Sequence, residues 1–169
     1  MTRPIVRFGE AILHKQAANV DEATPEVVAL VDDMVETMYA TSGIGLAAPQ
    51  LGLGLRIFVT DISSGQDRDA LVVMINPELI IYEGIQHQEE GCLSIPGFEA
   101  VVPRPKRAIV RGLDRGGQFN EIEAVGLQAR AFQHELDHLD GTLFVDRLRG
   151  IKRELILRRI KKLKRKGKW

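Results

Sequence analysis

The stretch that most constrains this chain lies at residues 124–141, where two histidines stand four positions apart. It reads AVGLQARAFQHELDHLDG, and His134, Glu135 and His138 match the pattern H-E-x-x-H. Residues four apart lie on one face of a helix, so both imidazoles would point in the same direction. The neighbouring side chains are mostly apolar, which predicts a buried helix, and Gly141 is a plausible stop for it.

The two histidines have two interpretations when the pentapeptide is taken alone. Either they are ordinary buried histidines in a chance match, or they hold a divalent metal ion. Cys92, the only cysteine, lies in a stretch bounded by glycine and proline and is either a small buried side chain or a reactive one. Thiolate and neutral imidazole both suit a borderline-soft ion, so Cys92, His134 and His138 form a sensible ligand set. Three ligands leave one position for water, and Glu135 lies beside it as a candidate general base.

Hydrophobic periodicity and turn residues predict the remaining elements. Thr24 and Pro25 are typical of a helix N-terminus, as N-cap and first helical residue. The predicted elements are a helix from 25 to about 39, strands at 56–62 and 71–75, a break at Asn76-Pro77 after which an extended pattern resumes at 78–83, irregular loops at 43–54 and 90–97, a hairpin of 107–113 with 119–125, and a helix at about 151–166.

Composition and length favour one globular domain covering residues 1–169. With 44% hydrophobic and 27% charged residues, the chain has an ordinary composition. We find no secretory signal and no apolar run long enough for a membrane span. A single cysteine excludes an internal disulfide and fits a reducing cytoplasm. His14 and His87 lie among polar residues and are interpreted as surface histidines, with His87 in an acidic turn.

The net charge of zero conceals a strong asymmetry. Residues 147–169 contain 12 Lys or Arg and one acid, which leaves 11 basic and 22 acidic residues in the rest of the chain. The basic segment at about 151–169 is either a solvated helix with a tail or a docking surface for an anionic partner. The sequence alone leaves both interpretations open.

Three stretches together resemble the signature motifs of the peptide deformylase family. They are GIGLAAPQ at 43–50, EGCLSIP at 90–96 and QHELDHLDG at 133–141, in the order and spacing of that family. The resemblance extends over roughly the first 148 residues. It implies an α+β fold in which short, mostly antiparallel sheets surround a central metal-binding helix, with a C-terminal helix after them.

The resemblance also implies an activity and a cofactor. Peptide deformylases hydrolyse the formyl group from the N-terminal formyl-methionine of nascent polypeptides and release formate. Their metal ligands would here be Cys92, His134 and His138. Most bacterial members use one Fe²⁺ per chain, which Zn²⁺, Ni²⁺ or Co²⁺ can replace. Such an enzyme would be cytoplasmic, without membrane attachment and monomeric, and the basic segment would be available to dock on the ribosome.

The same resemblance assigns roles to the remaining motif residues. Gln50 and the backbone N–H of Leu93 would form an oxyanion hole, and Glu135 would transfer the proton. Arg130, where related proteins often carry an apolar residue, is assigned to the rim of the pocket. The full set of substrate-binding residues is expected to be Gly43, Ile44, Gly45, Gly91, Leu127, Arg130 and Ala131.

Two other functions compete with this one. An H-E-x-x-H zinc peptidase would need a third ligand downstream, but Phe144 stands where one such class has histidine, and Glu154 lies in the basic segment. A nucleic-acid-binding protein with a structural zinc would use the basic segment. Structural zinc normally has four ligands, however, and the chain has no second cysteine.

Overall fold

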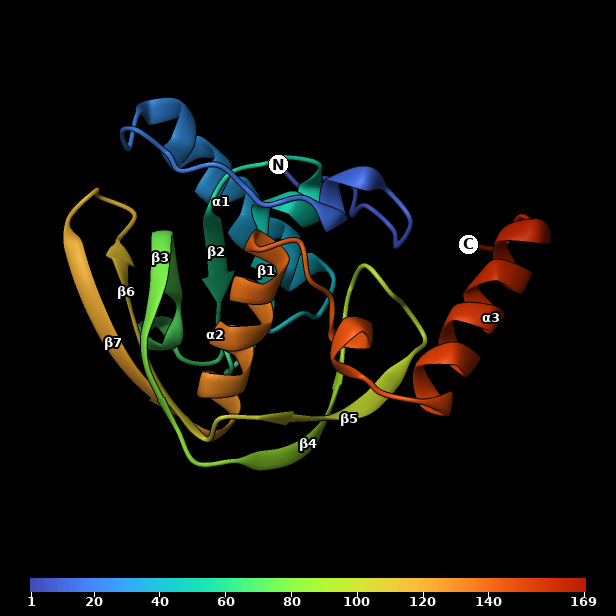
Figure 1. Ribbon diagram of the computed structural model, residues 1–169. Helices are drawn as coiled ribbons and strands as arrows, with labels where there is room; N and C mark the ends of the chain where they lie inside the picture. The colour runs from blue at the N-terminus through green and yellow to red at the C-terminus, as the bar shows by residue number, and fades with distance from the viewer.

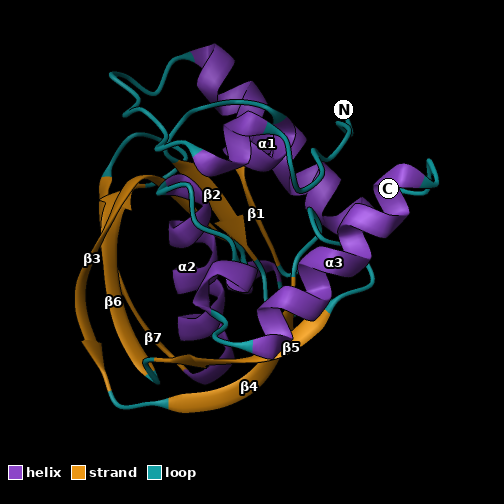
Figure 2. Ribbon diagram, turned by 45° about the vertical axis from the view of Figure 1, so that its right-hand side comes forward, coloured by secondary structure: helices purple, strands orange, loops and turns teal.

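Helix α2, Gly126–Leu139, lies at the centre of the molecule, and the strands curve around it (Figures 1 and 2). The computed structural model describes residues 1–169, except for the side chain of Arg68. As predicted, the helix is buried on its apolar flank, where Phe132 and Leu139 are inaccessible to solvent. Gly141 follows the helix with a φ of +74°, a left-handed conformation that favours glycine after a C-terminus.

Seven antiparallel strands form two sheets, which confirms the α+β class. The five-stranded sheet has the order β1-β2-β3-β6-β7, and β4 pairs with β5 in a separate two-stranded sheet. The strands are β1 Gly45–Ala47, β2 Ile57–Thr60, β3 Val72–Glu83, β4 Gln86–Gly91, β5 Glu99–Arg104, β6 Arg107–Leu113 and β7 Phe119–Val125.

The hairpin and the first long helix agree with the sequence patterns. Strands β6 and β7 have the predicted bounds, and Arg107 pairs with Val125 at the open end. Helix α1, Pro25–Ala40, begins at the predicted N-cap, because the Thr24 hydroxyl accepts a hydrogen bond from the backbone N–H of Val27 at 3.4 Å.

The predicted break at Asn76-Pro77 is wrong. Strand β3 continues through these residues with a shift of register between Ile75 and Glu78. Asn76 has a φ of +52°, which asparagine tolerates better than most residues. Its carboxamide also makes two 2.8 Å hydrogen bonds with the backbone of Val20. The chain therefore accommodates proline in a bulge instead of ending the strand.

The two glycine-rich stretches are more regular than predicted. The first contains β1 and a 3-10 helix at Ala48–Leu51, and the second begins inside β4. Strands β4 and β5 are absent from the prediction, because β4 reads QHQEEG and lacks apolar alternation. His87 is exposed as expected, but it lies in β4 and not in an acidic turn.

Helix α3, Ile151–Arg165, packs against the N-terminal segment and is more than a solvated appendage (Figure 2). Ile160 is only 2% exposed, in a core cluster with Leu13 and Phe144. Beyond the helix, the indole N–H of Trp169 donates to the carbonyl of Phe8 at 2.9 Å. Among the described residues, no helix is long and apolar enough to cross a membrane.

We predict that Ile160→Ala lowers the free energy of unfolding by about 2–4 kcal/mol, because it leaves a cavity in a closed cluster. The matched control is Leu155→Ala on the same helix, where the side chain is 53% exposed. This control should change stability by less than about 0.5 kcal/mol. Equal losses in chemical denaturation would contradict the observed orientation of α3.

Candidate metal centre and substrate cleft

Three potential metal ligands meet where β4 ends beside α2. Cys92 follows β4 directly, and His134 and His138 lie one turn apart on α2. Their ligand atoms all lie within 4.8 Å of one another, and Cys92 Sγ is 3.2 Å from His138 Nε2. Metal–sulfur and metal–nitrogen bonds of roughly 2.3 and 2.1 Å suit such separations. The donor set therefore fits a divalent transition-metal ion and leaves a coordination position for water.

Glu90 fixes the orientation of the first histidine. Its Oε1 atom lies 3.1 Å from Nδ1 of His134, which leaves Nε2 to face the ligand cluster. Burial alone would raise the pKa of Glu90, but hydrogen bonds from Arg104 and His134 hold that pKa well below its usual range. Arg104 donates to Glu90 at 2.8 and 2.5 Å, and Arg130 donates at 2.6 Å. The buried carboxylate is thus anionic and firmly held.

Asp137 extends this charge network to the next segment of the chain. It accepts hydrogen bonds from Arg104 at 2.9 Å and from Arg147 at 2.5 and 2.6 Å. Asp137 occupies a variable position of the H-E-x-x-H pattern and has a structural role here. Arg104 connects Asp137, which precedes His138, to Glu90, which orients His134.

The pKa values of the two imidazoles are shifted in opposite directions in the metal-free protein. Burial, with the nearby positive charges of His134 and Arg104, lowers the pKa of His138 and favours the neutral form that binds metals. Burial also acts to lower the pKa of His134, but hydrogen bonds to Cys92 and Glu90 raise it well above its usual value. A metal ion would compete with that proton, because ligating nitrogen must be unprotonated.

Glu135 points toward the cluster without being part of it. The side chain is 4% exposed, and its Oε2 atom has no hydrogen-bond partner among the described residues. Burial raises its pKa to about 7, near the value that suits a general base in neutral solution. Its other oxygen occupies the space that a Cβ atom at Gly45 would need, so glycine at this position of β1 allows the carboxylate to approach.

Gln50 presents an amide donor at the same place. Its Oε1 atom accepts the backbone N–H of Ala47 at 2.8 Å, so the Nε2 group is turned toward Cys92 and Ser94, at 3.6 and 3.3 Å. Leu93 lies in the turn that follows Cys92. Its backbone N–H makes no hydrogen bond to any other residue that the structure describes.

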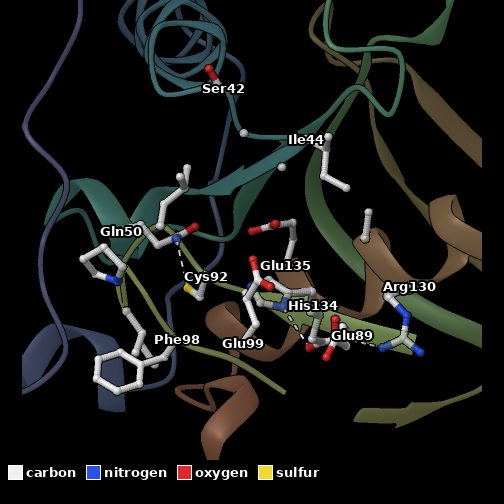
Figure 3. Close-up of a pocket in the computed structure, with 18 of the residues that line it drawn as sticks. Ser42, Ile44, Gln50, Glu89, Cys92, Phe98, Glu99, Arg130, His134 and Glu135 are labelled. Atoms are coloured by element: carbon white, nitrogen blue, oxygen red, sulfur yellow. Dashed lines mark hydrogen bonds and ion pairs between the residues drawn. The ribbon is translucent and has the colours of Figure 1, made fainter. Parts of the chain in front are cut away.

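A cavity of about 490 Å³ opens beside these groups, lined by Cys92, His134, Glu135 and Gln50 (Figure 3). The structure brings the predicted pocket residues to its wall, including Gly43, Ile44, Gly45, Gly91, Leu127 and Ala131. Arg130 also lines the cavity, but it is not at the rim. It is 3% exposed, and its guanidinium is engaged by Glu90.

Sequence reasoning assigned no role to the residues that orient the ligands. Glu90 stands within the EGCLSIP motif, two positions before Cys92, and that placement was the available signal. Arg104 carries no comparable signal, because its partners Glu90 and Asp137 lie 14 and 33 positions away. Its contact with Glu90 and Asp137 depends on the β4–β5 sheet, which the sequence did not predict.

We predict that Cys92→Ala, His134→Ala and His138→Ala each abolish stoichiometric binding of Co²⁺, because each removes a ligand from a three-ligand site. Metal content after dialysis and the Co²⁺ absorption spectrum provide the measurement. His14→Ala and His87→Ala are matched controls at exposed positions and should retain one ion per chain. A Cys92→Ala protein with full Co²⁺ occupancy would show that the third ligand lies elsewhere.

The chain is similar to known proteins of one family. Residues 2–154 match the family model for polypeptide deformylase. A peptide deformylase of Acidobacterium capsulatum is 48% identical over 169 residues, covering 100% of this chain and 99% of the relative. One from Thermodesulfovibrio yellowstonii is 48% identical over 157 residues, covering 93% and 95%.

The solved structures include a peptide deformylase from Legionella pneumophila, with a TM-score of 0.91 and 40% identity, covering 99% of this chain and 98% of that one. A plant peptide deformylase has a TM-score of 0.91 and 35% identity, covering 98% and 90%. A family match over almost the whole chain and a shared fold lead to one conclusion: this chain belongs to the polypeptide deformylase family.

Proposed function

We propose that this chain is a metal-dependent hydrolase that removes the formyl group from the N-terminal formyl-methionine of nascent polypeptides and releases formate. Family membership supports the activity. The observation that carries it is the convergence of a Cys-His-His cluster, Glu135 and Gln50 on one cavity. A ligand set with an open position next to a buried carboxylate suits hydrolysis better than structural metal binding.

The substrate peptide is proposed to lie extended between β1 and the end of β4. Strand β1 is at the edge of the larger sheet, where a peptide can pair with free backbone groups. Gly43, Gly45 and Gly91 line the cavity along this path and are proposed to present their backbone to the peptide. Ile44, Leu127 and Ala131 are proposed as the apolar wall against which the methionine side chain would pack, and Arg130 also lines the cavity.

A metal ion held by Cys92, His134 and His138 would lower the pKa of a bound water and would polarise the formyl carbonyl. Glu135 accepts the proton of the attacking water and then donates it to the leaving nitrogen. Gln50 Nε2 and the Leu93 N–H donate hydrogen bonds to the oxygen on which negative charge develops. The hydrogen bond from Ala47 fixes the Gln50 amide in the required orientation before substrate binds.

Cys92, His134 and His138 are the proposed ligands of one Fe²⁺ ion. A thiolate with two imidazoles also suits Zn²⁺, Ni²⁺ and Co²⁺, so these ions are proposed as substitutes. The competing functions lack comparable support. Glu154, the downstream acid that a zinc peptidase would need, is exposed on α3 and lies outside the ligand cluster. The three-ligand cluster at an open cavity also differs from a closed structural zinc site.

We predict that Glu135→Gln keeps the metal and lowers formate release from formyl-Met peptides by about 10²–10⁴-fold, because the variant cannot accept the proton. Formate release and metal content should be measured on the same anaerobic preparation. Glu121→Gln, at an exposed position on β7, is the control for the removed charge. A Glu135→Gln enzyme with near-normal turnover would contradict the mechanism, and loss of its metal would make Glu135 a ligand.

The basic face of α3 is proposed to bind the ribosome, whose RNA is a dense polyanion. The buried side of α3 contains Ile156 and Ile160, whereas Arg158, Lys162 and Arg165 are exposed together on the opposite side. These three residues are spaced by four and three positions and so share a helical face. Because the apolar side of α3 belongs to the core, deleting the helix would disturb the fold as well as the charge.

We predict that Arg158→Glu/Lys162→Glu reduces co-sedimentation with ribosomes at low salt and leaves hydrolysis of short formyl-Met peptides unchanged. Neutralising phosphates releases counterions, so binding of the unmodified protein should fall steeply with salt. Lys15→Glu/Lys106→Glu makes the same charge change at exposed positions outside α3. Equal co-sedimentation of both variants would leave the α3 charges as a solvated surface.

We further propose that residues 1–169 act as one domain and as a monomer. The packing of α3 on the N-terminal segment supports a single unit, because both ends of the chain share one core cluster. The proposed substrate places the enzyme in the cytoplasm, where nascent chains are made.

A further inference from the structure

Trp169, which follows α3, contacts two segments that are far from it in the sequence. Its indole N–H donates a hydrogen bond to the carbonyl of Phe8 at 2.9 Å. Its ring meets the ring of Phe98 in an edge-to-face arrangement, with centroids 6.1 Å apart and planes inclined by 60°. The guanidinium of Arg7 lies over the same indole, 5.9 Å from the ring centroid. Trp169 is therefore anchored through both its polar and its apolar parts.

Phe98 belongs to the wall of the cavity described above. It lines this cavity together with Cys92 and Gln50, and it lies on the side away from Ile44 and Arg130 (Figure 3). Ile44 is part of the wall proposed for the methionine side chain. Phe98 is therefore placed to face the residues that follow the methionine in a bound peptide.

The backbone beside Phe98 does little to fix its side chain. Gly97 precedes it with a φ of +81°, and a Cβ atom at Gly97 would meet nothing within 4 Å. Glycine has the greatest conformational freedom of any residue, so the side chain after it depends on contacts made elsewhere. The Trp169 ring supplies such a contact, and edge-to-face pairs stabilise beyond the area that they bury. Both rings also pack against the core cluster that contains Ile160 of α3.

The groups assigned to catalysis have supports that do not include Trp169. The Gln50 side chain accepts the backbone N–H of Ala47 at 2.8 Å, and the carbonyl of Gln50 accepts the N–H of Val6 at 2.8 Å. The first histidine of α2 is oriented by Glu90. Loss of the Trp169 ring should therefore change how a peptide is held, and not how fast its bound formyl group is hydrolysed.

We propose that Trp169 is a positioning residue that holds the Phe98 ring beside the substrate path, an inference that rests on the proposed deformylase function. With the ring in place, a peptide that continues beyond the methionine gains an apolar contact in the cavity. A substrate that ends at the methionine does not reach Phe98. Trp169 therefore affects the KM of longer peptides, whereas kcat and the hydrolysis of the shortest substrate do not depend on it.

The test uses the full-length, metal-loaded enzyme with two substrates, formyl-Met-Ala-Leu and formyl-Met-amide. Trp169→Ala should raise the KM of formyl-Met-Ala-Leu by about threefold to tenfold, the effect of losing one aromatic pair. Its kcat on this peptide, and its kcat/KM on formyl-Met-amide, should stay within about twofold of the unmodified enzyme. Trp169→Phe keeps a ring that can contact Phe98, so its KM should return toward the original value.

Phe98→Ala shows whether Trp169 acts through Phe98. Adding Trp169→Ala to Phe98→Ala should then leave the KM of formyl-Met-Ala-Leu unchanged, whereas independent effects would multiply. Trp169 is the only tryptophan of the chain, so its fluorescence reports the contact without turnover. The product peptide Met-Ala-Leu, at saturating concentration, should shift the emission of the unmodified enzyme and leave that of Phe98→Ala unchanged.

The matched control is Tyr82→Ala, which removes a 64% exposed aromatic side chain outside the cavity. It should keep the KM of the unmodified enzyme for both substrates. An unchanged KM of formyl-Met-Ala-Leu in Trp169→Ala, or an equal loss on both substrates, would overturn the inference and leave the proposed function standing. Failure of the unmodified enzyme to release formate from formyl-Met-Ala-Leu would overturn the proposed function and this inference together.

Discussion

The buried carboxylate of Glu90 is the interaction on which the site depends. It accepts hydrogen bonds from Arg104 on β5 and Arg130 on α2, and it contacts His134. A buried charge is costly unless it is paired, and removing one partner of such a group strongly destabilises a protein. The small sheet therefore cannot move relative to α2 without disturbing the histidine. This connection keeps Cys92, which follows β4, opposite His134 and His138 on α2.

Burial also sets the chemistry next to the metal centre. The same helix carries Glu135 and two of the three proposed metal ligands, and its apolar flank anchors it in the core. Glu135 is desolvated without a compensating hydrogen bond on Oε2, so its pKa rises to about 7. Gly45 leaves space for its other oxygen. A fold that merely held a metal would have no need for this unpaired carboxylate.

The sequence predicted the parts whose signals are local. The H-E-x-x-H helix, the Thr24 cap and the β6–β7 hairpin all depend on residues close together in the chain, and the structure confirms them. The three motifs identified the family because their combination is specific. Strands β4 and β5 escaped prediction because β4 is polar throughout and is defined by its partner. Arg104 was missed for the same reason. The bulge at Asn76 was interpreted from the sequence as the end of a strand.

We propose that one metal ion, held by Cys92, His134 and His138, is required for the hydrolytic activity of this chain. The most direct test is to titrate the metal-free protein with Fe²⁺ under anaerobic conditions and to follow formate release from a formyl-Met peptide. We expect the rate to rise in proportion to bound metal and to reach its plateau at one ion per chain. Formate release by the fully metal-free protein, or binding of one Fe²⁺ per chain without any formate release, would contradict this dependence on the metal.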